Sequence, residues 1–347
     1  MGNKIRLLIV DDSILIRKML SEVFAESDDI EVVGMAADPF IAREKIKQLS
    51  PDVLTLDVEM PKMNGLQFLS NLMRLRPMPV VMVSTLTESG APATLDALEM
   101  GAVDYIAKPK AESEEQFRKF AEQLRDKVRM AAGARVQPLA GVRKPRVGAV
   151  PPPSANTRYK RIVAVGSSTG GTEAIREMLL GVPAVCPPIV ITQHIPPVFS
   201  ASFAMRLNSN LPMEVLEAAE GLEVRTGRVI IAHGDYHLRF RRDGNSVYCV
   251  LDDAEKVNRH RPSVEVMFDS LGELMPADKV VAVMLTGMGA DGAAAMKRLH
   301  DKGVKTFAQD ESSSVVWGMP RAAYELGAVD EVLPLASIAD SMVDAAR

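Results

Sequence analysis

The chain has 347 residues, of which 47% are hydrophobic and 25% are charged, and its formal net charge at pH 7 is −4. This length accommodates two compact domains, and the charge balance does not favour nucleic acid or an anionic membrane as a partner. Cys186 and Cys249 are far apart and lack the spacing of a disulfide framework or a zinc site, so we expect buried thiols. The absence of long apolar runs predicts a cytoplasmic protein without membrane insertion.

The first 109 residues alternate short apolar runs with amphipathic stretches. These patterns predict strands at residues 5–10, 32–33, 53–56, 80–83 and 105–107, and helices at residues 14–25, 39–49, 66–75 and 91–100. Continuous apolar strands of this kind are typical of a parallel sheet that helices cover on both faces. With a further helix at residues 114–130, the sequence predicts a doubly wound, five-stranded, flavodoxin-like α/β domain over residues 1–130.

A change of composition separates this domain from a second one. Residues 131–158 are rich in Pro, Gly and basic residues without apolar periodicity, which predicts a linker. Strands are then predicted at residues 162–165, 188–192, 229–232 and 280–285, helices at 172–180 and 292–299, and a hairpin strand at 246–251. The sequence therefore predicts a second doubly wound, mostly parallel α/β domain of the hydrolase type over residues 159–347.

Polar side chains follow four of the predicted strands in the first domain. They are Asp11 and Asp12 after the first strand, Asp57 after the third, Ser84 with Thr85 after the fourth, and Lys108 after the fifth. Ligands of open parallel sheets bind beyond the carboxyl ends of the strands, so we expect these side chains to meet. Clustered carboxylates indicate a site for a hard cation such as Mg²⁺, beside which one carboxylate can accept a phosphoryl group.

The order Asp–Asp, Asp, Ser–Thr and Lys–Pro at successive strand ends resembles the receiver domain of two-component response regulators over residues 4–109. The resemblance implies that Asp57 is the phosphoacceptor and that Ser84 and Lys108 contact the phosphoryl group. It also implies that Tyr105 is an aromatic switch, although plain packing explains a tyrosine there equally well. The groups implied to hold Mg²⁺ are the side chains of Asp11, Asp12 and Asp57 and the backbone carbonyl of Glu59.

Three loops of the second domain carry a serine pair, a histidine and an aspartate. The segment 162–171, IVAVGSSTGG, passes from a strand through a tight turn into a helix, which suits either a raised nucleophile or a bound phosphate. His194 follows the next predicted strand, and Asp291 precedes a helix that it could simply cap. At three neighbouring rims of one sheet, however, these residue types satisfy the geometric requirements of a Ser-His-Asp triad.

The motifs GSSTGG, TQHIPP and LTGMGADG resemble the catalytic domain of the chemotaxis protein-glutamate methylesterase family, the CheB family, over residues 159–347. The triad implied by the resemblance is Ser168 as nucleophile, His194 as general base and acid, and Asp291 as orienting acid. The backbone N–H of Met288 is implied to form part of an oxyanion hole, and no cofactor is implied for this domain. Ser167 departs from a position that is often small and apolar in the family. Arg206 and His260 lie in similar segments, where substrate contacts and structural roles are both open.

These resemblances imply a phosphorylation-activated hydrolase that removes methyl esters from glutamates of methyl-accepting chemoreceptors and deamidates receptor glutamines. They also imply a chemotaxis-type histidine kinase as phosphoryl donor. From the two-domain architecture we expect the unphosphorylated receiver to cover the rim bearing Ser168 and phosphorylation of Asp57 to weaken that contact. The alternative is a catalytically inactive response regulator that docks on receptors. A DNA-binding regulator would need a basic helix-turn-helix module after the linker, and a dinucleotide-dependent oxidoreductase would need a GxGxxG loop, which GSSTGG does not match.

Overall fold

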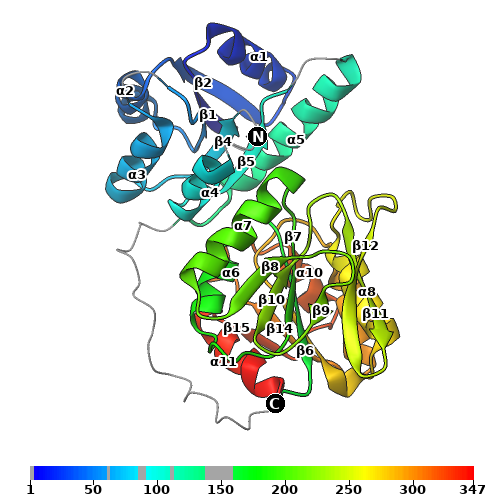
Figure 1. Ribbon diagram of the computed structural model, residues 1–347. Helices are drawn as coiled ribbons and strands as arrows, with labels where there is room; N and C mark the ends of the chain where they lie inside the picture. Colours follow the sequence, from blue (N-terminus) through cyan, green and yellow to red (C-terminus); the bar gives the residue numbers. More distant parts are fainter. Residues whose placement is uncertain (1–3, 61–62, 85–90, 110–112, 137–158) are drawn as a thin grey trace. The chain divides into compact units, whose positions relative to one another are not determined.

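The computed structural model describes residues 4–60, 63–84, 91–109, 113–136 and 159–347. The chain divides into two compact units, Met1–Val142 and Arg143–Arg347 (Figure 1). Among the described residues, no helix combines the length and the apolar character that a membrane crossing requires.

The first unit is built on a five-stranded parallel sheet with the order β2-β1-β3-β4-β5. Its strands are β1 Ile5–Val10, β2 Ile30–Ala36, β3 Val53–Leu56, β4 Val80–Ser84 and β5 Asp104–Ala107. Its helices are α1 Ile14–Ala25, α2 Pro39–Leu49, α3 Gly65–Leu75, α4 Ala91–Glu99 and α5 Glu114–Ala132. Every residue of β3 and β4 is buried, as expected for central strands covered on both faces. The predicted doubly wound, five-stranded fold is confirmed.

Polar caps explain where several of these helices begin. The side chains of Ser13, Asp38, Asn64 and Ser113 accept hydrogen bonds from backbone N–H groups in the first turns of α1, α2, α3 and α5. The cap after β1 therefore starts α1 directly behind Asp11 and Asp12, whereas the cap of α3 lies seven residues after Asp57. Helix α5 extends two residues past the predicted end at residue 130, because Ala131 is buried against the domain and only Gly133 ends the helix.

The second unit contains a seven-stranded, entirely parallel sheet with the order β15-β14-β13-β6-β7-β10-β8. Its strands are β6 Ile162–Ser167, β7 Ile189–Gln193, β8 Glu214–Glu217, β10 Arg228–Ile231, β13 Val280–Met284, β14 Lys305–Gln309 and β15 Glu331–Leu333. A small antiparallel sheet consists of β11 His237–Asp243, β12 Ser246–Asp252 and β9 Glu223–Val224. The helices are α6 Gly171–Leu180, α7 Pro197–Asn210, α8 Val264–Leu274, the 3₁₀ turn η2 Ala277–Lys279, α9 Ala293–Asp301, α10 Met319–Glu325 and α11 Leu335–Ala345.

Helices cover both faces of this sheet, which confirms the predicted doubly wound fold of the second domain. Helix α6 packs against α11, and α8 packs against α9 and against β11 of the small sheet. Ala164 and Ala282 of the central strands face the α8 side, where they join an apolar cluster with Met267 and Phe268. Strand β6 lies between β7 and β13, so the chain leaves β6 in one direction and returns on its other side. Such a switch point opens a crevice at the carboxyl ends of the strands.

Candidate active site and acidic pocket

The three predicted catalytic side chains lie beyond the carboxyl ends of neighbouring central strands. Ser168 directly follows β6, His194 directly follows β7, and Asp291 lies in the loop between β13 and α9. Because β6 pairs with both β7 and β13, the sheet itself brings these loops together. In the structure the three loops thus converge at the carboxyl ends of β6, β7 and β13, as predicted.

The three side chains form a continuous hydrogen-bonded series. Ser168 Oγ lies 3.1 Å from His194 Nδ1, and His194 Nε2 lies 2.8 Å from Asp291 Oδ2. A carboxylate can only accept, so the partners assign the proton to Nε2 and leave the Nδ1 lone pair to accept from the serine hydroxyl. The ring nitrogens are therefore used in the opposite sense to the chymotrypsin arrangement, in which Nε2 faces the serine. Either arrangement gives the imidazole one acceptor toward the nucleophile and one donor toward the acid.

Asp291 is an ionised, deeply buried carboxylate. Its Oδ2 accepts hydrogen bonds from His194 Nε2 and from the backbone N–H of Val264 (2.7 Å), and its Oδ1 accepts from Ser263 Oγ (2.7 Å) and Asn258 Nδ2 (2.8 Å). Burial raises the pKa of this carboxyl, but the donors outweigh burial and lower the pKa to about 2. The side chain does not cap its own helix, since the first turn of α9 follows Gly292 without a side-chain cap. The simple N-cap interpretation of Asp291 is therefore wrong.

Gln193 links the backbones of Ser168 and His194, a role that the sequence analysis did not assign to it. Its Nε2 donates to the backbone carbonyls of Ser168 (2.9 Å) and His194 (3.1 Å). This orients Oε1 toward Ser167, whose hydroxyl donates to it over 2.7 Å. Ser167 is fully buried, so its hydroxyl is engaged in bracing the loop. A Cβ at position 171 would lie 2.1 Å from Gln193 Oε1, which accounts for Gly171 at this point of the turn.

The loop after β13 holds the Gly287–Met288 peptide beside the nucleophile. The carbonyl of Gly287 accepts hydrogen bonds from the N–H groups of Gly318 (3.1 Å) and Met319 (2.8 Å). In a trans peptide the N–H points away from the carbonyl, so these two bonds fix the direction of the Met288 N–H. A Cβ on Gly287 would lie 2.8 Å from the Ser168 Cβ, which puts this peptide beside the serine.

The Met288 N–H is the donor available at this position. The Ser168 N–H donates to the Thr286 carbonyl over 3.0 Å, whereas among the described residues no acceptor takes the Met288 N–H.

Of the two open candidates for substrate contacts, Arg206 lies partly buried on α7 and His260 lies in the turn that precedes α8. The site thus combines a hydroxyl, a proton acceptor, an orienting carboxylate and a backbone donor.

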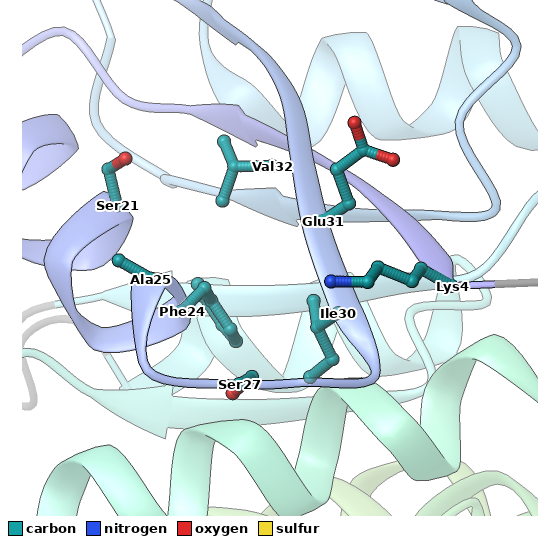
Figure 2. Close-up of a pocket in the computed structure, with 8 residues that line it drawn as sticks. All are labelled: Lys4, Ser21, Phe24, Ala25, Ser27, Ile30, Glu31 and Val32. Carbon is teal, nitrogen blue, oxygen red and sulfur yellow. The ribbon is translucent and has the colours of Figure 1, made fainter.

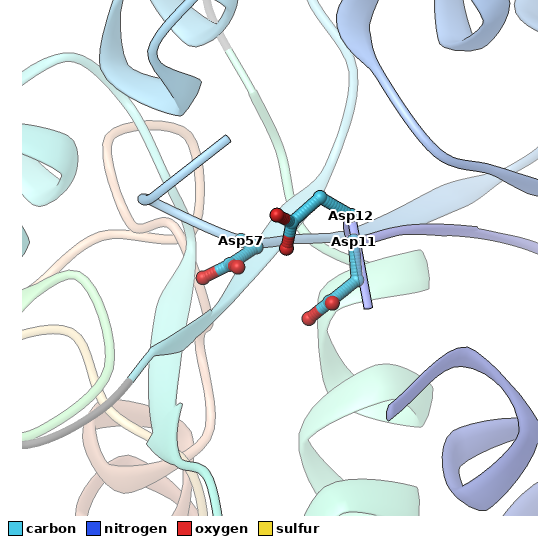
Figure 3. A group of neighbouring side chains, drawn as sticks. All are labelled: Asp11, Asp12 and Asp57. Atoms are coloured by element: carbon cyan, nitrogen blue, oxygen red, sulfur yellow. The ribbon is translucent and has the colours of Figure 1, made fainter. Parts of the chain in front are cut away.

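The first unit carries a separate acidic pocket at the carboxyl ends of β1 and β3 (Figure 3). Carboxylate oxygens of Asp11, Asp12 and Asp57 all lie within 4.8 Å of one another. Lys108 Nζ lies 2.8 Å from Asp11 Oδ2 and 2.7 Å from Asp57 Oδ2. Burial raises the pKa of Asp57 to about 6, with Lys108 opposing the rise and Asp11 adding to it.

This pocket suits a hard divalent cation. Asp11 Oδ2 is buried and, apart from its ion pair with Lys108, accepts no hydrogen bond from the described residues. Three converging carboxylates and a buried oxygen with spare acceptor capacity match the all-oxygen coordination of Mg²⁺. The described residues contain one such group of potential metal-binding side chains.

The remaining residues implied for the phosphate switch and the metal lie on β4, on β5 and in the loop after β3. Ser84 is buried at the end of β4, and its carbonyl accepts the Lys108 N–H over 2.8 Å. Tyr105 lies on β5 with Lys127 Nζ 5.9 Å from its ring centroid, and Glu59 is exposed two residues after Asp57. Thr85 lies outside the described residues.

A hollow in the first unit is unrelated to this chemistry. It has a volume of about 490 Å³ and is lined by Lys4, Ser21, Phe24, Ala25, Ser27, Ile30, Glu31 and Val32 (Figure 2). Lys4 and Ile30 stand at the amino ends of β1 and β2, whereas Asp11 and Asp57 stand at the carboxyl ends. The hollow therefore lies at the wrong end of the sheet to serve the acidic pocket.

Comparison with known proteins bears on both units. The protein-family model described as CheB methylesterase matches residues 163–342 of this chain. The family model described as response regulator receiver domain matches residues 7–118. The chain is 54% identical to the protein-glutamate methylesterase/protein-glutamine glutaminase 1 of Hahella chejuensis, over 98% of this chain and 96% of that protein. It is 50% identical to protein-glutamate methylesterase/protein-glutamine glutaminase 2 of Saccharophagus degradans, over 98% of each chain. The solved CheB methylesterase catalytic domain of Thermotoga maritima is 39% identical, with a TM-score of 0.52 over 53% of this chain and 97% of that one. With a family model covering half of its length and relatives at such identity, this chain belongs to the CheB methylesterase family.

Proposed function

We propose that this protein hydrolyses the γ-methyl esters of glutamates on methyl-accepting chemoreceptors, deamidates receptor glutamines, and is activated by phosphorylation of its N-terminal domain. The relatives that match it over nearly their whole length carry the names of both activities. The observation that carries the proposal is the hydrogen-bonded series from Ser168 through His194 to Asp291.

Acylation is the first half of the proposed reaction. Ser168 Oγ attacks the γ-carbonyl carbon of the ester while His194 Nδ1 takes the hydroxyl proton. The carbonyl oxygen becomes an oxyanion that accepts the Met288 N–H, and one donor of this kind lowers the barrier by about 3–4 kcal/mol. The bond between the carbonyl carbon and the methoxy oxygen then breaks, His194 returns its proton to that oxygen, and methanol leaves. Asp291 stabilises the imidazolium between the two proton transfers.

Deacylation reverses these roles with water. His194 Nδ1 takes a proton from a water molecule that attacks the acyl carbon, and the proton passes to Ser168 Oγ as the ester bond breaks. The product is a glutamate side chain, which adds one negative charge to the receptor. With glutamine as substrate the same steps release ammonia in place of methanol.

The N-terminal domain is proposed to act as the phosphate-dependent switch. We assign residues 1–130 to the receiver, residues 131–158 to the linker and residues 159–347 to the catalytic domain. A histidine kinase of the chemotaxis type would phosphorylate Asp57, after which Lys108 pairs with the phosphate, Ser84 contacts a phosphoryl oxygen and Tyr105 reorients. The groups that would hold Mg²⁺ are Asp11, Asp12, Asp57 and the backbone carbonyl of Glu59. When bound, the metal supplies positive charge that neutralises the transferring phosphoryl oxygens.

Methanol release from a methylated chemoreceptor fragment tests the esterase. The full chain should release methanol, Ser168→Ala should abolish the release, and Ser209→Ala, an exposed serine on α7, should release it at the parental rate. Equal release by the parent and Ser168→Ala would remove Ser168 from the mechanism. No release by the parent in its phosphorylated state would instead favour the receptor-docking alternative.

A further inference from the structure

A tight turn at residues 257–260 lies directly against the triad. Val257 and His260 form an isolated antiparallel bridge, with backbone hydrogen bonds of 3.1 and 2.9 Å in the two directions. Between them Asn258 and Arg259 both adopt left-handed conformations, with φ values of 51° and 70°. Asparagine tolerates this region, whereas an arginine rarely adopts it. Strained backbone of this kind persists where the surroundings hold it in place, and it is concentrated at functional sites.

The turn reaches two members of the triad with two side chains. Asn258 Nδ2 donates to Asp291 Oδ1 over 2.8 Å. The His260 ring lies flat on the His194 ring, with 3.6 Å between the ring centroids and an interplanar angle of 7°. One four-residue turn therefore contacts the acid through a hydrogen bond and the base through a ring face.

The residues after the turn anchor it on both sides. Arg261 pairs with the Asp235 carboxylate over 3.0 Å and donates to the carbonyls of Asp253 (2.6 Å) and Ala254 (3.1 Å). Two residues later, Ser263 Oγ donates to the same Asp291 oxygen as Asn258. The position of the turn is thus tied to the acid and to the preceding loop at once.

The contacts of His194 indicate what the stacked ring of His260 contributes to its position. Ring nitrogens donate and accept in the plane of the imidazole, so the hydrogen bonds to Ser168 and Asp291 restrain the ring edges and leave tilt out of the plane comparatively soft. A ring stacked on one face opposes that tilt, which keeps the Nδ1 lone pair directed at the serine hydroxyl. Proton transfer depends on this alignment.

We propose that the turn 257–260 is a positioning element of the active site. In it, His260 restrains the tilt of the His194 ring, and Asn258 fixes the position of Asp291 Oδ1. The proposal rests on the esterase function proposed above. His260 contacts His194 through its ring face and Asn258 contacts Asp291 through its amide, so both act through triad residues and are positioning residues in this proposal. The contribution of His260 is its flat ring, and the contribution of Asn258 is its amide donor.

Kinetics of methanol release by the phosphorylated full chain test the two positions. His260→Ala should lower kcat on the order of 10–100-fold with KM changed less than about twofold, because a misplacement near 1 Å costs about 100-fold in rate. His260→Phe keeps a flat ring and should remain within about threefold of the parent, whereas His260→Leu, which fills volume without a flat ring, should resemble His260→Ala. Asn258→Gly accepts the left-handed conformation but lacks the amide, and should lower kcat about tenfold.

Matched controls separate the proposal from loss of folding and from failure of the esterase. His300→Ala removes a histidine near the end of α9 that contacts Asp330 and should leave kcat unchanged. Fluorescence of Trp317, the only tryptophan in the chain, reports folding of each variant. A parent that releases methanol while Ser168→Ala does not establishes the esterase whatever the turn variants do.

Three outcomes would overturn the positioning roles. If both His260→Ala and His260→Leu keep kcat within about twofold of the parent, the stacked ring does not matter to the reaction. If His260→Phe is as slow as His260→Ala, His260 acts as a proton-carrying group and not as a flat ring. If folded Asn258→Gly retains full kcat, the amide does not position Asp291.

Discussion

Asp291 carries a full charge although its side chain is only 2% exposed. Four donors make that possible: one follows the end of β7, and three lie in the short segment 258–264, all of them distant from Asp291 along the chain. They are His194, Asn258, Ser263 and the backbone N–H of Val264. With its pKa lowered to about 2, the carboxylate is ionised at neutral pH, which suits the proposed role of orienting and stabilising the imidazole.

Asp291→Asn should lower kcat by about four orders of magnitude. In serine hydrolases an amide at the acid position stabilises the wrong imidazole tautomer, with a loss of about 10⁴-fold. Here the amide would turn its donor toward Nε2 and leave the proton on Nδ1, where it opposes the serine hydroxyl. Asp301→Asn, on the exposed end of α9, is the matched control and should retain parental kcat in the methanol-release assay. A loss of less than tenfold in Asp291→Asn would contradict the orienting role.

The lowered pKa of Asp291 predicts that the free energy of unfolding of the second unit depends on pH. This pKa is lowered from 3.8 to about 2 in the folded protein, so the contribution of the carboxyl is complete above the unfolded value and is lost as the pH falls toward 2. A shift of nearly two units corresponds to about 2 kcal/mol. Urea unfolding of the second unit, followed by Trp317 fluorescence, should show the parent losing this much relative to Asp291→Asn between pH 4 and pH 2. A difference that does not change over that interval would argue against the lowered pKa.

At the scale of elements, the packing of α8 on β6 links the core to the site. A Cβ at position 166 would lie 2.3 Å from Val264 Cγ1, so only glycine on β6 lets α8 approach this closely. The first residue of α8 is Val264 itself, whose N–H donates to Asp291. The distance between α8 and β6 therefore helps to set the position of Asp291, the proposed catalytic acid.

Gly166→Ala should damage stability and activity together. We expect a loss of about 1–3 kcal/mol from overpacking, with a fall in kcat because α8 moves and takes its donor away from Asp291. Val264→Ala removes the atoms that the new methyl group meets, so the double variant should recover much of both losses. Urea unfolding and methanol release measure the two effects. Simple additivity of the two substitutions would show that this contact does not transmit the strain.

Several elements of the second unit could not be predicted from local patterns, and β14 shows why. It reads Lys305-Thr-Phe-Ala-Gln309, with too few apolar residues to resemble a buried strand, yet Thr306 and Gln309 are fully buried. The Thr306 N–H and hydroxyl both donate to Asp330, and Gln309 Oε1 accepts the Thr286 N–H. Burial of these polar groups depends on partners that lie more than twenty residues away. The strands β8, β9 and β15 and the helices α7, α8, α10 and α11 were likewise not predicted.

At the scale of the whole molecule, a phosphate-accepting unit and a hydrolytic unit share one chain, which indicates that the first regulates the second. The triad lies entirely within the second unit, and the acidic pocket entirely within the first. Phosphorylation therefore has to act on the esterase through the relation between units, and we propose that the unphosphorylated receiver covers the rim bearing Ser168.

Deletion of residues 1–140 tests this occlusion. The truncated protein should hydrolyse the methylated receptor fragment faster than the unphosphorylated full chain, because its active site is permanently accessible. The truncated Ser168→Ala variant supplies the blank, and the isolated catalytic domain of the Thermotoga maritima relative has been solved as a separate chain. If the truncated enzyme is no faster, covering of the rim is the wrong mechanism.

Asp57→Asn tests whether phosphorylation of Asp57 activates the esterase. Without a phosphodonor its methanol release should equal that of the parent, since Asp57 takes no part in the esterase site. With Mg²⁺ and acetyl phosphate the parent should be activated and the variant should not, because an amide cannot accept the phosphoryl group. Asp126→Asn, an exposed position on α5, should respond like the parent. Activation of Asp57→Asn would place the phosphoacceptor elsewhere.

The sequence by itself determined both fold classes and pointed to the residues of both proposed sites, because their signals are local. Apolar strands, a glycine-rich turn and acidic strand ends can each be identified within about ten residues. Tertiary structure alone decided what surrounds Ser168, His194 and Asp291. The return of β13 to the far side of β6, the brace of Gln193 and the stacking of His260 depend on contacts between residues remote in the chain. Such contacts leave no periodic trace in the sequence, since they follow from strand order and packing.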